Sequence, residues 1–201
     1  MINSSQLPID IRAHRRSSSA GLEADPAQFP EALRRLPRGV SVITFGEGDE
    51  RFGLTATSVS SLSLDPPAIL VSVDRKAPIS QGFLRSRSFG VSVLTAGQDA
   101  LADRFFGGAG VTEIERCRES VWVAPASGVP LLADAIAAFD CELEDIMECH
   151  GYAIVVGRVR GVRAPGKSSA LVYWRGTYSQ LGWTEDEISR AVGMSPKSAP
   201  S

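Results

Sequence analysis

Short apolar runs that alternate or carry β-branched residues recur along most of the chain, and they constrain its fold more than any other feature. A period of two and enrichment in Val, Ile and Thr are typical of β-strands. The runs lie at 40–45, 53–64, 68–74, 89–95, 138–147, 152–162 and 170–181. Most of the connections are short, and 46–50 has the composition of a hairpin turn. The sequence therefore predicts a mainly β, mostly antiparallel protein.

A few helices are expected to interrupt these strands. Apolar residues recur at helical spacing within 97–106, and further helices are predicted at 78–85 and near the start, beginning between Pro26 and Pro30. Closing a sheet on itself removes its exposed edges. Seven short strands with two or three inserted helices thus predict a closed or nearly closed barrel.

Length and composition indicate one globular domain. The chain has 201 residues, 43% hydrophobic and 22% charged, with a net charge of -2. Such a balance gives no reason to expect nucleic acid or an anionic membrane as a partner, and no window approaches the about 18 apolar residues of a membrane helix. We expect a disordered N-terminal tail at 1–24, the folded domain at 25–183, and a short helix with a mobile tail at 184–201.

Several reaction classes are disfavoured by missing residues. Three cysteines without CxxC spacing and the lack of a secretory leader predict a reducing cytoplasm rather than disulfides or zinc. One of the two histidines, His14, lies in the predicted tail, and no Gly-x-Ser-x-Gly elbow accompanies His150, so a hydrolase is disfavoured. A full dinucleotide fingerprint and a P-loop are also missing from the sequence. Any nucleotide must bind in another way.

A row of small hydroxyl residues precedes the third of these runs. Seven of the fifteen residues in 53–67 are Ser, Thr or Gly. Hydroxyls along a strand offer donors and acceptors on one side, and small residues let a flat ligand lie against the backbone. The residues alone leave an alternative equally open, in which Ser and Thr make an edge strand soluble. Cations and hydroxyls suited to a phosphate follow at Ser72, Arg75, Lys76 and Ser80.

Five segments in order carry a family resemblance. They are 36–44, 53–67 with 71–73, 89–105, 156–159 and 171–178. Over about 29 to 181 the chain resembles the flavin reductase family, the short-chain reductases of two-component flavin monooxygenases.

The resemblance implies a fold, an activity and partners. It implies an FMN-binding split β-barrel, usually a homodimer, that uses NADH or NADPH to reduce FMN or FAD. The hydride passes from nicotinamide C4 to flavin N5, and the reduced flavin goes to a separate oxygenase. In such enzymes the nicotinamide stacks on the flavin, which explains the missing dinucleotide fingerprint.

The resemblance also implies site residues. The residues that would border the isoalloxazine ring are Thr55, Ala56, Thr57 and Ser58. Those that would serve the ribityl chain and the phosphate are Ser61, Ser72, Arg75, Lys76 and Ser80.

The nicotinamide contact is where the sequence departs from the family. Many relatives carry Gly-Asp-His or Gly-Thr-His just before a closing strand, and counting back from Gly157 puts Tyr152 at the His position. His150 lies two residues earlier, and on a regular strand the two would share a face. Either is therefore a candidate catalytic residue, while a surface or subunit-contact role for His150 and a wall role for Tyr152 stay open.

Other interpretations also stay open. The aromatic residues Tyr173, Trp174 and Tyr178 could line the flavin edge, or they could belong to the core or a subunit interface. A flavin-binding carrier or sensor without activity is one alternative function, and a standalone flavin or ferric reductase is another.

Overall fold

The computed structural model describes residues 25–46, 51–76, 85–106, 120–166 and 169–183. It divides into two units, one ending at Leu33 and one beginning at Arg34. The short helix α1, Phe29–Arg34, lies at this boundary. The predicted tails and most of the helix expected at 78–85 lie outside the described residues.

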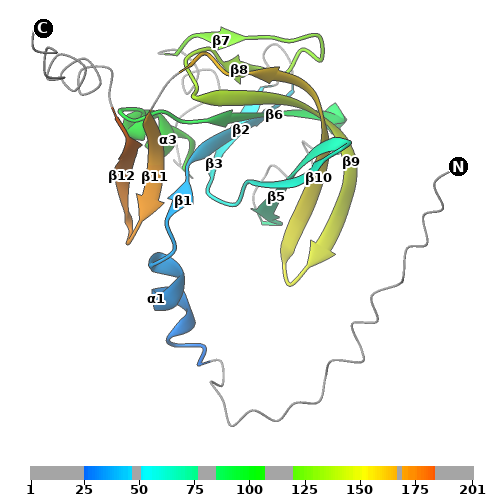
Figure 1. Cartoon of the computed structure of the whole chain (residues 1–201). Helices are drawn as coiled ribbons and strands as arrows, with labels where there is room; N and C mark the ends of the chain where they lie inside the picture. Colours follow the sequence, from blue (N-terminus) through cyan, green and yellow to red (C-terminus); the bar gives the residue numbers. More distant parts are fainter. Residues whose placement is uncertain (1–24, 47–50, 77–84, 107–119, 167–168, 184–201) are drawn as a thin grey trace, which may run out of the picture. The chain divides into compact units, whose positions relative to one another are not determined.

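The main sheet has seven strands, and every two neighbouring strands in it are antiparallel (Figure 1). Its order is β3-β2-β6-β9-β10-β5-β4. The bounds are β2 Ser41–Phe45, β3 Phe52–Ala56, β4 Ser60–Leu64, β5 Pro67–Asp74, β6 Ser88–Val93, β9 Ala137–Cys149 and β10 Tyr152–Arg163. The prediction of a mainly β, mostly antiparallel protein is therefore confirmed.

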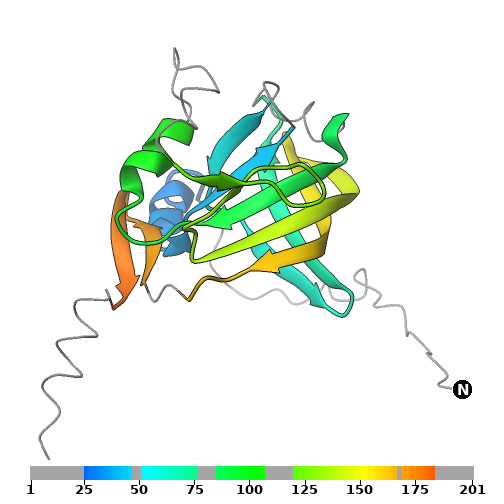
Figure 2. The ribbon, with the colours of Figure 1, turned by 90° about the horizontal axis from the view of Figure 1, so that it is seen from above.

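The seven-stranded sheet curls around a common interior (Figure 2). The long pair β9 and β10 bends through two shifts of register, between Val156 and Gly157 and between Val159 and Gly161. Such irregularities increase twist and curvature. Among the described strands no ladder joins β3 to β4, so the closure of the barrel stays a prediction.

Two smaller sheets complete the fold. A three-stranded sheet has the order β1-β11-β12, with bounds β1 Arg38–Gly39, β11 Ser169–Trp174 and β12 Thr177–Gly182. A two-stranded sheet pairs β7, Trp122–Val123, with β8, Leu131–Leu132. The three-stranded sheet is fastened to the main one at Val40, whose N–H donates to Leu171 O and whose carbonyl accepts from Leu94 N, at 3.0 and 2.9 Å.

The hydroxyl-rich run 53–64 is not one strand. It forms β3 and β4, which lie at opposite ends of the seven-strand order. The break falls at 57–59, where the Ser58 hydroxyl donates to the carbonyl oxygen of Ser72 at 2.7 Å. A side chain bonded to a backbone in this way competes with the ladder. The prediction of a single continuous strand is therefore wrong.

Two further predictions of single elements can be compared with the structure. The run 170–181 folds as a hairpin, because Arg175 and Gly176 have positive φ values of 52° and 86°, which a two-residue turn requires. The helix predicted within 97–106 is present as α3, Asp99–Phe105.

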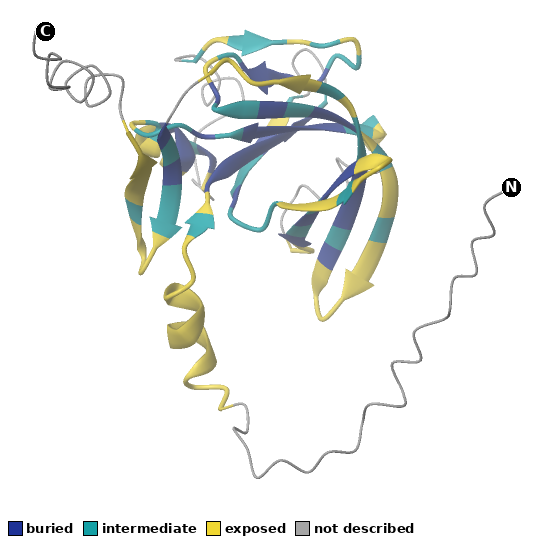
Figure 3. Ribbon diagram, in the orientation of Figure 1, coloured by how far each residue is buried: buried dark blue, intermediate teal, exposed yellow. Residues whose placement is uncertain are grey.

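Two buried clusters hold the strands together (Figure 3). One lies among the strands of the main sheet and includes Phe45, Val71 and Phe89. The other includes Leu94 and Phe105 and lies between the main sheet, α3 and the three-stranded sheet. Among the described residues, no helix has the length and apolar character needed to cross a membrane.

Candidate functional site

Helix α3 is fixed on strand β3 by close packing and one hydrogen bond. Gly53 allows the approach, since a Cβ there would meet two carbons of the Phe105 ring at 2.5 and 2.7 Å. Two residues along β3, the Thr55 hydroxyl donates to the carbonyl oxygen of Ala102 at 2.6 Å. Phe105 and Ala102 are both buried. These contacts determine where the exposed face of α3 stands.

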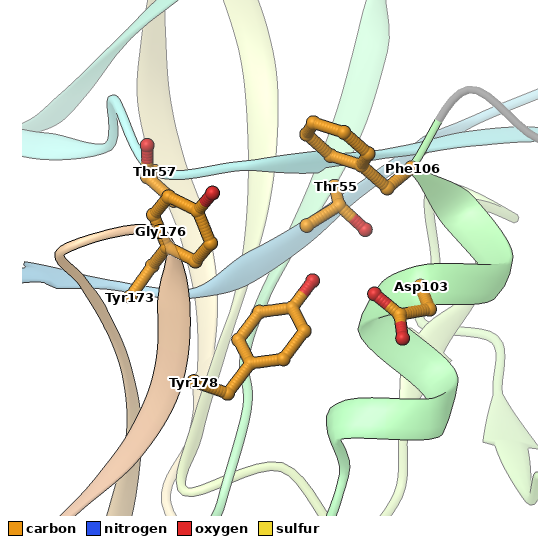
Figure 4. Close-up of a pocket in the computed structure, with 7 residues that line it drawn as sticks. All are labelled: Thr55, Thr57, Asp103, Phe106, Tyr173, Gly176 and Tyr178. Atoms are coloured by element: carbon orange, nitrogen blue, oxygen red, sulfur yellow. The ribbon is translucent and has the colours of Figure 1, made fainter.

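A pocket lies between α3, the end of β3 and the β11–β12 hairpin; we name it the α3 pocket (Figure 4). Its volume is about 220 Å³, below the roughly 300–1,000 Å³ of pockets that enclose drug-sized ligands. It can therefore hold one ring system but not a whole dinucleotide. Its lining residues are Thr55, Thr57, Asp103, Phe106, Tyr173, Gly176 and Tyr178.

Two tyrosines form one wall of this pocket. Tyr173 and Tyr178 are direct partners across the β11–β12 ladder, and their ring centroids lie 5.5 Å apart in an edge-to-face arrangement. Trp174 is turned elsewhere, since its indole N–H donates to the carbonyl oxygen of Arg35 at 3.1 Å. Of the three aromatic residues left open by the sequence, two therefore line the pocket.

Tyr178 and Asp103 face each other across the pocket. Figure 4 shows the Tyr178 hydroxyl directed to the space between Thr55 and Asp103. Burial, and then a hydrogen bond to the Asp103 carboxylate, raise the pKa of Tyr178 to about 12. At neutral pH the phenol thus stays protonated, and its O–H donates a hydrogen bond to the carboxylate.

The hydroxyls of this region fall into two groups. Those of Thr55 and Ser58 are donors to backbone carbonyls and so hold the fold. Thr57 makes no side-chain hydrogen bond to another described residue and lines the pocket. Ala56 is buried in the core among the strands, so only its backbone could meet a ligand. Thr57 is consequently the hydroxyl most available to one.

The residues predicted for the phosphate lie along β4 and β5. Ser61 is exposed on the edge strand β4, opposite Ile69. Arg75 donates its backbone N–H to Gly151 O at 3.1 Å, and its side chain pairs with Glu148 at 2.9 Å. Both side chains of that pair are more than half exposed, and such pairs contribute little to stability. A phosphate could therefore replace Glu148 as the partner of Arg75.

Two other residues of this group have different surroundings. Ser72 is partly buried, and its carbonyl oxygen receives the Ser58 hydroxyl. Lys76 is exposed, and its backbone N–H donates to the Asp74 carboxylate at 2.9 Å. Ser80 lies outside the described residues.

His150 and Tyr152 do not share a regular strand. His150 and Gly151 form the two-residue turn between β9 and β10, with φ values of 49° and 83°. Tyr152 is the first residue of β10 and pairs with both Cys149 and Asp74. The expectation of a common face is wrong, because two consecutive positive φ values end the strand at Cys149.

The hairpin turn and the α3 pocket are separate regions joined by the 57–59 connection. Neither His150 nor Tyr152 lines the pocket. Ser58 reaches Ser72, and Ser72 precedes Asp74, the partner of Tyr152, by two residues or about 7 Å of strand. Ser72 and Tyr152 also share the sheet face opposite Val71 and Val73, which belong to the core.

Sequence reasoning missed Asp103 and Phe106 as pocket residues. Asp103 lies in the last turn of α3 and Phe106 directly follows Phe105, the last residue of α3, whose helical spacing marked it for the core. Their role follows from the packing of α3 on β3, and the one local signal is the pair Asp99 and Asp103, spaced four apart on an exposed face. Among the described residues, no group of three or more His, Cys, Asp or Glu side chains could hold a metal ion.

One family model covers most of this chain. The model of the flavin reductase like domain matches residues 33–182. This chain belongs to that family. The match includes β3, α3 and the β11–β12 hairpin, so the whole α3 pocket lies within the family domain. The resemblance predicted from the sequence is confirmed.

Named relatives align with this chain over nearly their full length. FMN reductase (NADH) RutF 1 of Methylorubrum extorquens is 32% identical over 193 residues, which are 92% of this chain and 95% of that protein. The flavin reductase (NADH) of Kitasatospora aureofaciens is 31% identical over 192 residues, 94% of this chain and 93% of that one. The relatives thus carry in their names the enzyme class that the sequence predicts.

Solved structures of the family share the fold. BorF, the flavin reductase component of a bacterial two-component tryptophan halogenase, aligns with a TM-score of 0.72 and 33% identity, over 79% of this chain and 99% of BorF. SgcE6, an NADH:FAD oxidoreductase of Streptomyces globisporus solved with NAD and FAD fragments, gives a TM-score of 0.72 and 29% identity, over 81% and 98%.

Proposed function

We propose that this protein is an NAD(P)H-dependent flavin reductase that takes FMN or FAD as a substrate and transfers a hydride from nicotinamide C4 to flavin N5. The observation that carries the proposal is the α3 pocket, with two tyrosines, Phe106 and an open Thr57 hydroxyl around space for one ring system. The named relatives support NADH as the donor. The chemistry belongs to the two cofactors, and the protein positions them.

The flavin would lie with its ring system in the α3 pocket. The described lining residues include one carboxylate and no cation, a set that suits an aromatic ring and repels a phosphate. Arg75 and Lys76 supply cations three and four residues beyond Ser72, about 10 Å or more along the chain from the Ser58 contact. The donor set therefore fits a ring at one end and a phosphate at the other.

The nicotinamide would stack on the part of the ring that projects from the pocket beside 57–58. Tyr152 stands on the same sheet face as Ser72 and is half exposed, so its side chain is placed to contact a group there. His150, in the adjoining turn, is the second candidate. We keep both as proposed contacts, with Ser61 and Ser72 beside the ribityl chain.

We also propose a split β-barrel and a homodimer. The curled sheet supports the first. For the second, Leu62 and Leu64 of the edge strand β4 expose 52% and 91% of their surface. Exposed apolar side chains on an edge strand mark an interaction surface. The free thiols of Cys141 and Cys149 fit the proposed reducing cytoplasm.

The reduced flavin would be delivered to a separate oxygenase. BorF, at 33% identity, is described as the reductase component of a two-component system, and this likeness supports the proposal. A flavin carrier without activity and a standalone flavin or ferric reductase are the alternatives that an assay must separate.

The test is oxidation of NADH and NADPH, followed by the loss of their absorbance with FMN, FAD or riboflavin added. Turnover supports the reductase, whereas tight flavin binding without turnover identifies a carrier. A ferric acceptor that outpaces every flavin would favour the ferric reductase.

Arg75→Ala provides the matched test of the phosphate end. It should weaken FMN binding about fivefold or more, because a charged hydrogen bond is lost. Riboflavin, which has no phosphate, should bind as it does to the wild type. Equal effects on both ligands would contradict the placement.

A further inference from the structure

We propose that Asp103 makes the site bind oxidised flavin more tightly than reduced flavin, and so promotes release of the product. The inference rests on the proposed function and concerns the α3 pocket. This carboxylate would act in product release, although it takes no part in the hydride transfer itself.

The first observation is the position of the charge. Among the described residues that line the pocket, Asp103 carries the one formal charge. Its place is fixed from two sides, because the Thr55–Ala102 hydrogen bond anchors α3 on β3 and the Tyr178 hydroxyl donates to the carboxylate.

The second observation is that the field of this carboxylate reaches into the pocket. Besides burial and the hydrogen bond to Asp103, repulsion by the Asp103 charge and, to a smaller extent, by the Asp99 charge raises the pKa of Tyr178. A negative charge placed on a ring beside Tyr178 would meet the same repulsion that opposes a tyrosinate there.

The reaction places such a charge on the ring. The C4–H bond of the dihydronicotinamide breaks, an N5–H bond forms, and two electrons and one proton move together as a hydride. NADH thereby becomes NAD⁺, whose nicotinamide gains a positive charge, and the neutral isoalloxazine becomes an anion, the form in which reduced flavin is titrated above neutral pH. Asp103 repels the reduced anion but not the neutral oxidised ring. The affinities for substrate and product therefore diverge.

The magnitude is moderate, since Asp103 is exposed and water screens its charge. We expect a factor of about five in the ratio of the dissociation constants of reduced and oxidised flavin, within the range of partly screened charge pairs. For a two-electron couple this factor corresponds to a potential of bound flavin about 20 mV lower than without the charge.

The experiment compares the wild type with Asp103→Asn, which removes the charge and keeps an acceptor for Tyr178. Oxidised FMN and dithionite-reduced FMN are titrated anaerobically, and the potential of bound FMN is measured by spectroelectrochemistry. The ratio of dissociation constants, reduced over oxidised, should fall about fivefold in the variant. Because the phosphate is common to both ligands, its contribution cancels.

Two matched variants isolate the charge. Asp103→Glu keeps it and should retain most of the wild-type ratio. Asp99→Asn removes a carboxylate one turn earlier on α3 that does not line the pocket, and its effect should be clearly smaller. In the wild type, raising the salt concentration should also bring the ratio closer to one. This salt dependence provides the test even if a variant does not fold.

The inference is overturned if Asp103→Asn changes both dissociation constants equally, or if salt leaves the wild-type ratio unchanged. Failure of the proposed function has a different signature, since the wild type would then bind neither form of FMN or would not oxidise NADH. If the wild type reduces flavin normally but Asp103→Asn leaves the ratio of dissociation constants unchanged, only this inference is contradicted.

Discussion

The α3 pocket and the β9–β10 turn each contain residues predicted to contact a ligand, Thr55 and Thr57 in the first and His150 in the second, yet they are built in different ways. The pocket is fixed by buried contacts between Gly53 and Phe105 and by the Thr55–Ala102 hydrogen bond. The turn carries exposed side chains, and its ion pair, Arg75 with Glu148, is mostly exposed. Core packing therefore fixes the walls of the α3 pocket, whereas the exposed side chains at the β9–β10 turn can change position when a ligand binds.

The largest effect is expected at Gly53. In Gly53→Ala the new methyl group would collide with the Phe105 ring, which is buried and must shift with α3. The free energy of unfolding should fall by about 1–3 kcal/mol, and flavin affinity should fall with it. Urea unfolding and flavin titration measure the two quantities.

A matched control exists at Gly39, where a Cβ would meet nothing within 4 Å. Gly39→Ala should change stability by no more than about 0.5 kcal/mol. If the two variants lost equal stability, close packing of α3 on β3 would not be what the pocket depends on.

The second prediction compares the hydroxyls of Thr55 and Thr57, which lie two residues apart. Thr55→Val removes the donor to Ala102 and should cost about 1 kcal/mol of stability. Thr57→Val breaks no hydrogen bond to a described residue, so its stability should stay within about 0.5 kcal/mol while flavin binds about fivefold more weakly. Unchanged flavin affinity in Thr57→Val would remove Thr57 from the proposed site.

The third effect concerns the turn. His150 adopts a positive φ of 49° before Gly151, and Asn is favoured over His in this position of a two-residue hairpin. His150→Asn should therefore raise the free energy of unfolding by about 0.5 kcal/mol. Stopped-flow measurement of NADH-dependent flavin reduction then shows whether the imidazole contributes.

Tyr152→Ala is the companion variant at the hairpin end. If Tyr152 contacts the nicotinamide, hydride transfer should slow by about fivefold or more, as expected for a lost ring contact. Unchanged hydride-transfer rates in both variants would rule out this end of the hairpin as the nicotinamide site.

The last prediction is a pH dependence of stability that appears only at alkaline pH. The pKa of Tyr178 is about 12 in the folded chain and about 10 in an unfolded one. As the pH rises from about 10 to about 12 the unfolded state loses this proton first, so stability should fall across that window. Tyr178→Phe should reduce the fall, and Asp103→Asn should let the phenol ionise nearer its ordinary pKa. Urea unfolding and the tyrosinate absorbance at several pH values test both statements.

Local patterns predicted the strands well because alternation reports burial of one face, as in Ala68 to Val73 within β5. They failed at 53–64, where the pattern continues although the chain changes partners. The Ser58–Ser72 hydrogen bond that breaks the strand joins residues fourteen apart, and neither periodicity nor composition encodes such a contact.

The site was predictable to a similar degree. Thr57 and Arg75 could be selected because hydroxyls and cations have a chemistry of their own. Asp103 and Phe106 could not, since their proximity to Tyr178 depends on how α3 packs against β3 and on the β11–β12 turn. His150 was misplaced because a left-handed turn at a histidine has no strong sequence signal apart from the glycine that follows it.

The length of the three-residue connection at 57–59 limits the insertions that this chain can accept during evolution. Surface connections usually tolerate insertions. This one begins at the edge of the sheet formed by β3 and ends at the edge formed by β4, so its length determines the span between them. One added residue would displace Thr57 from the pocket or Ser58 from Ser72. We therefore expect viable insertions to collect elsewhere, and the spacing from Thr55 to Ser60 to tolerate substitution far better than a change in length.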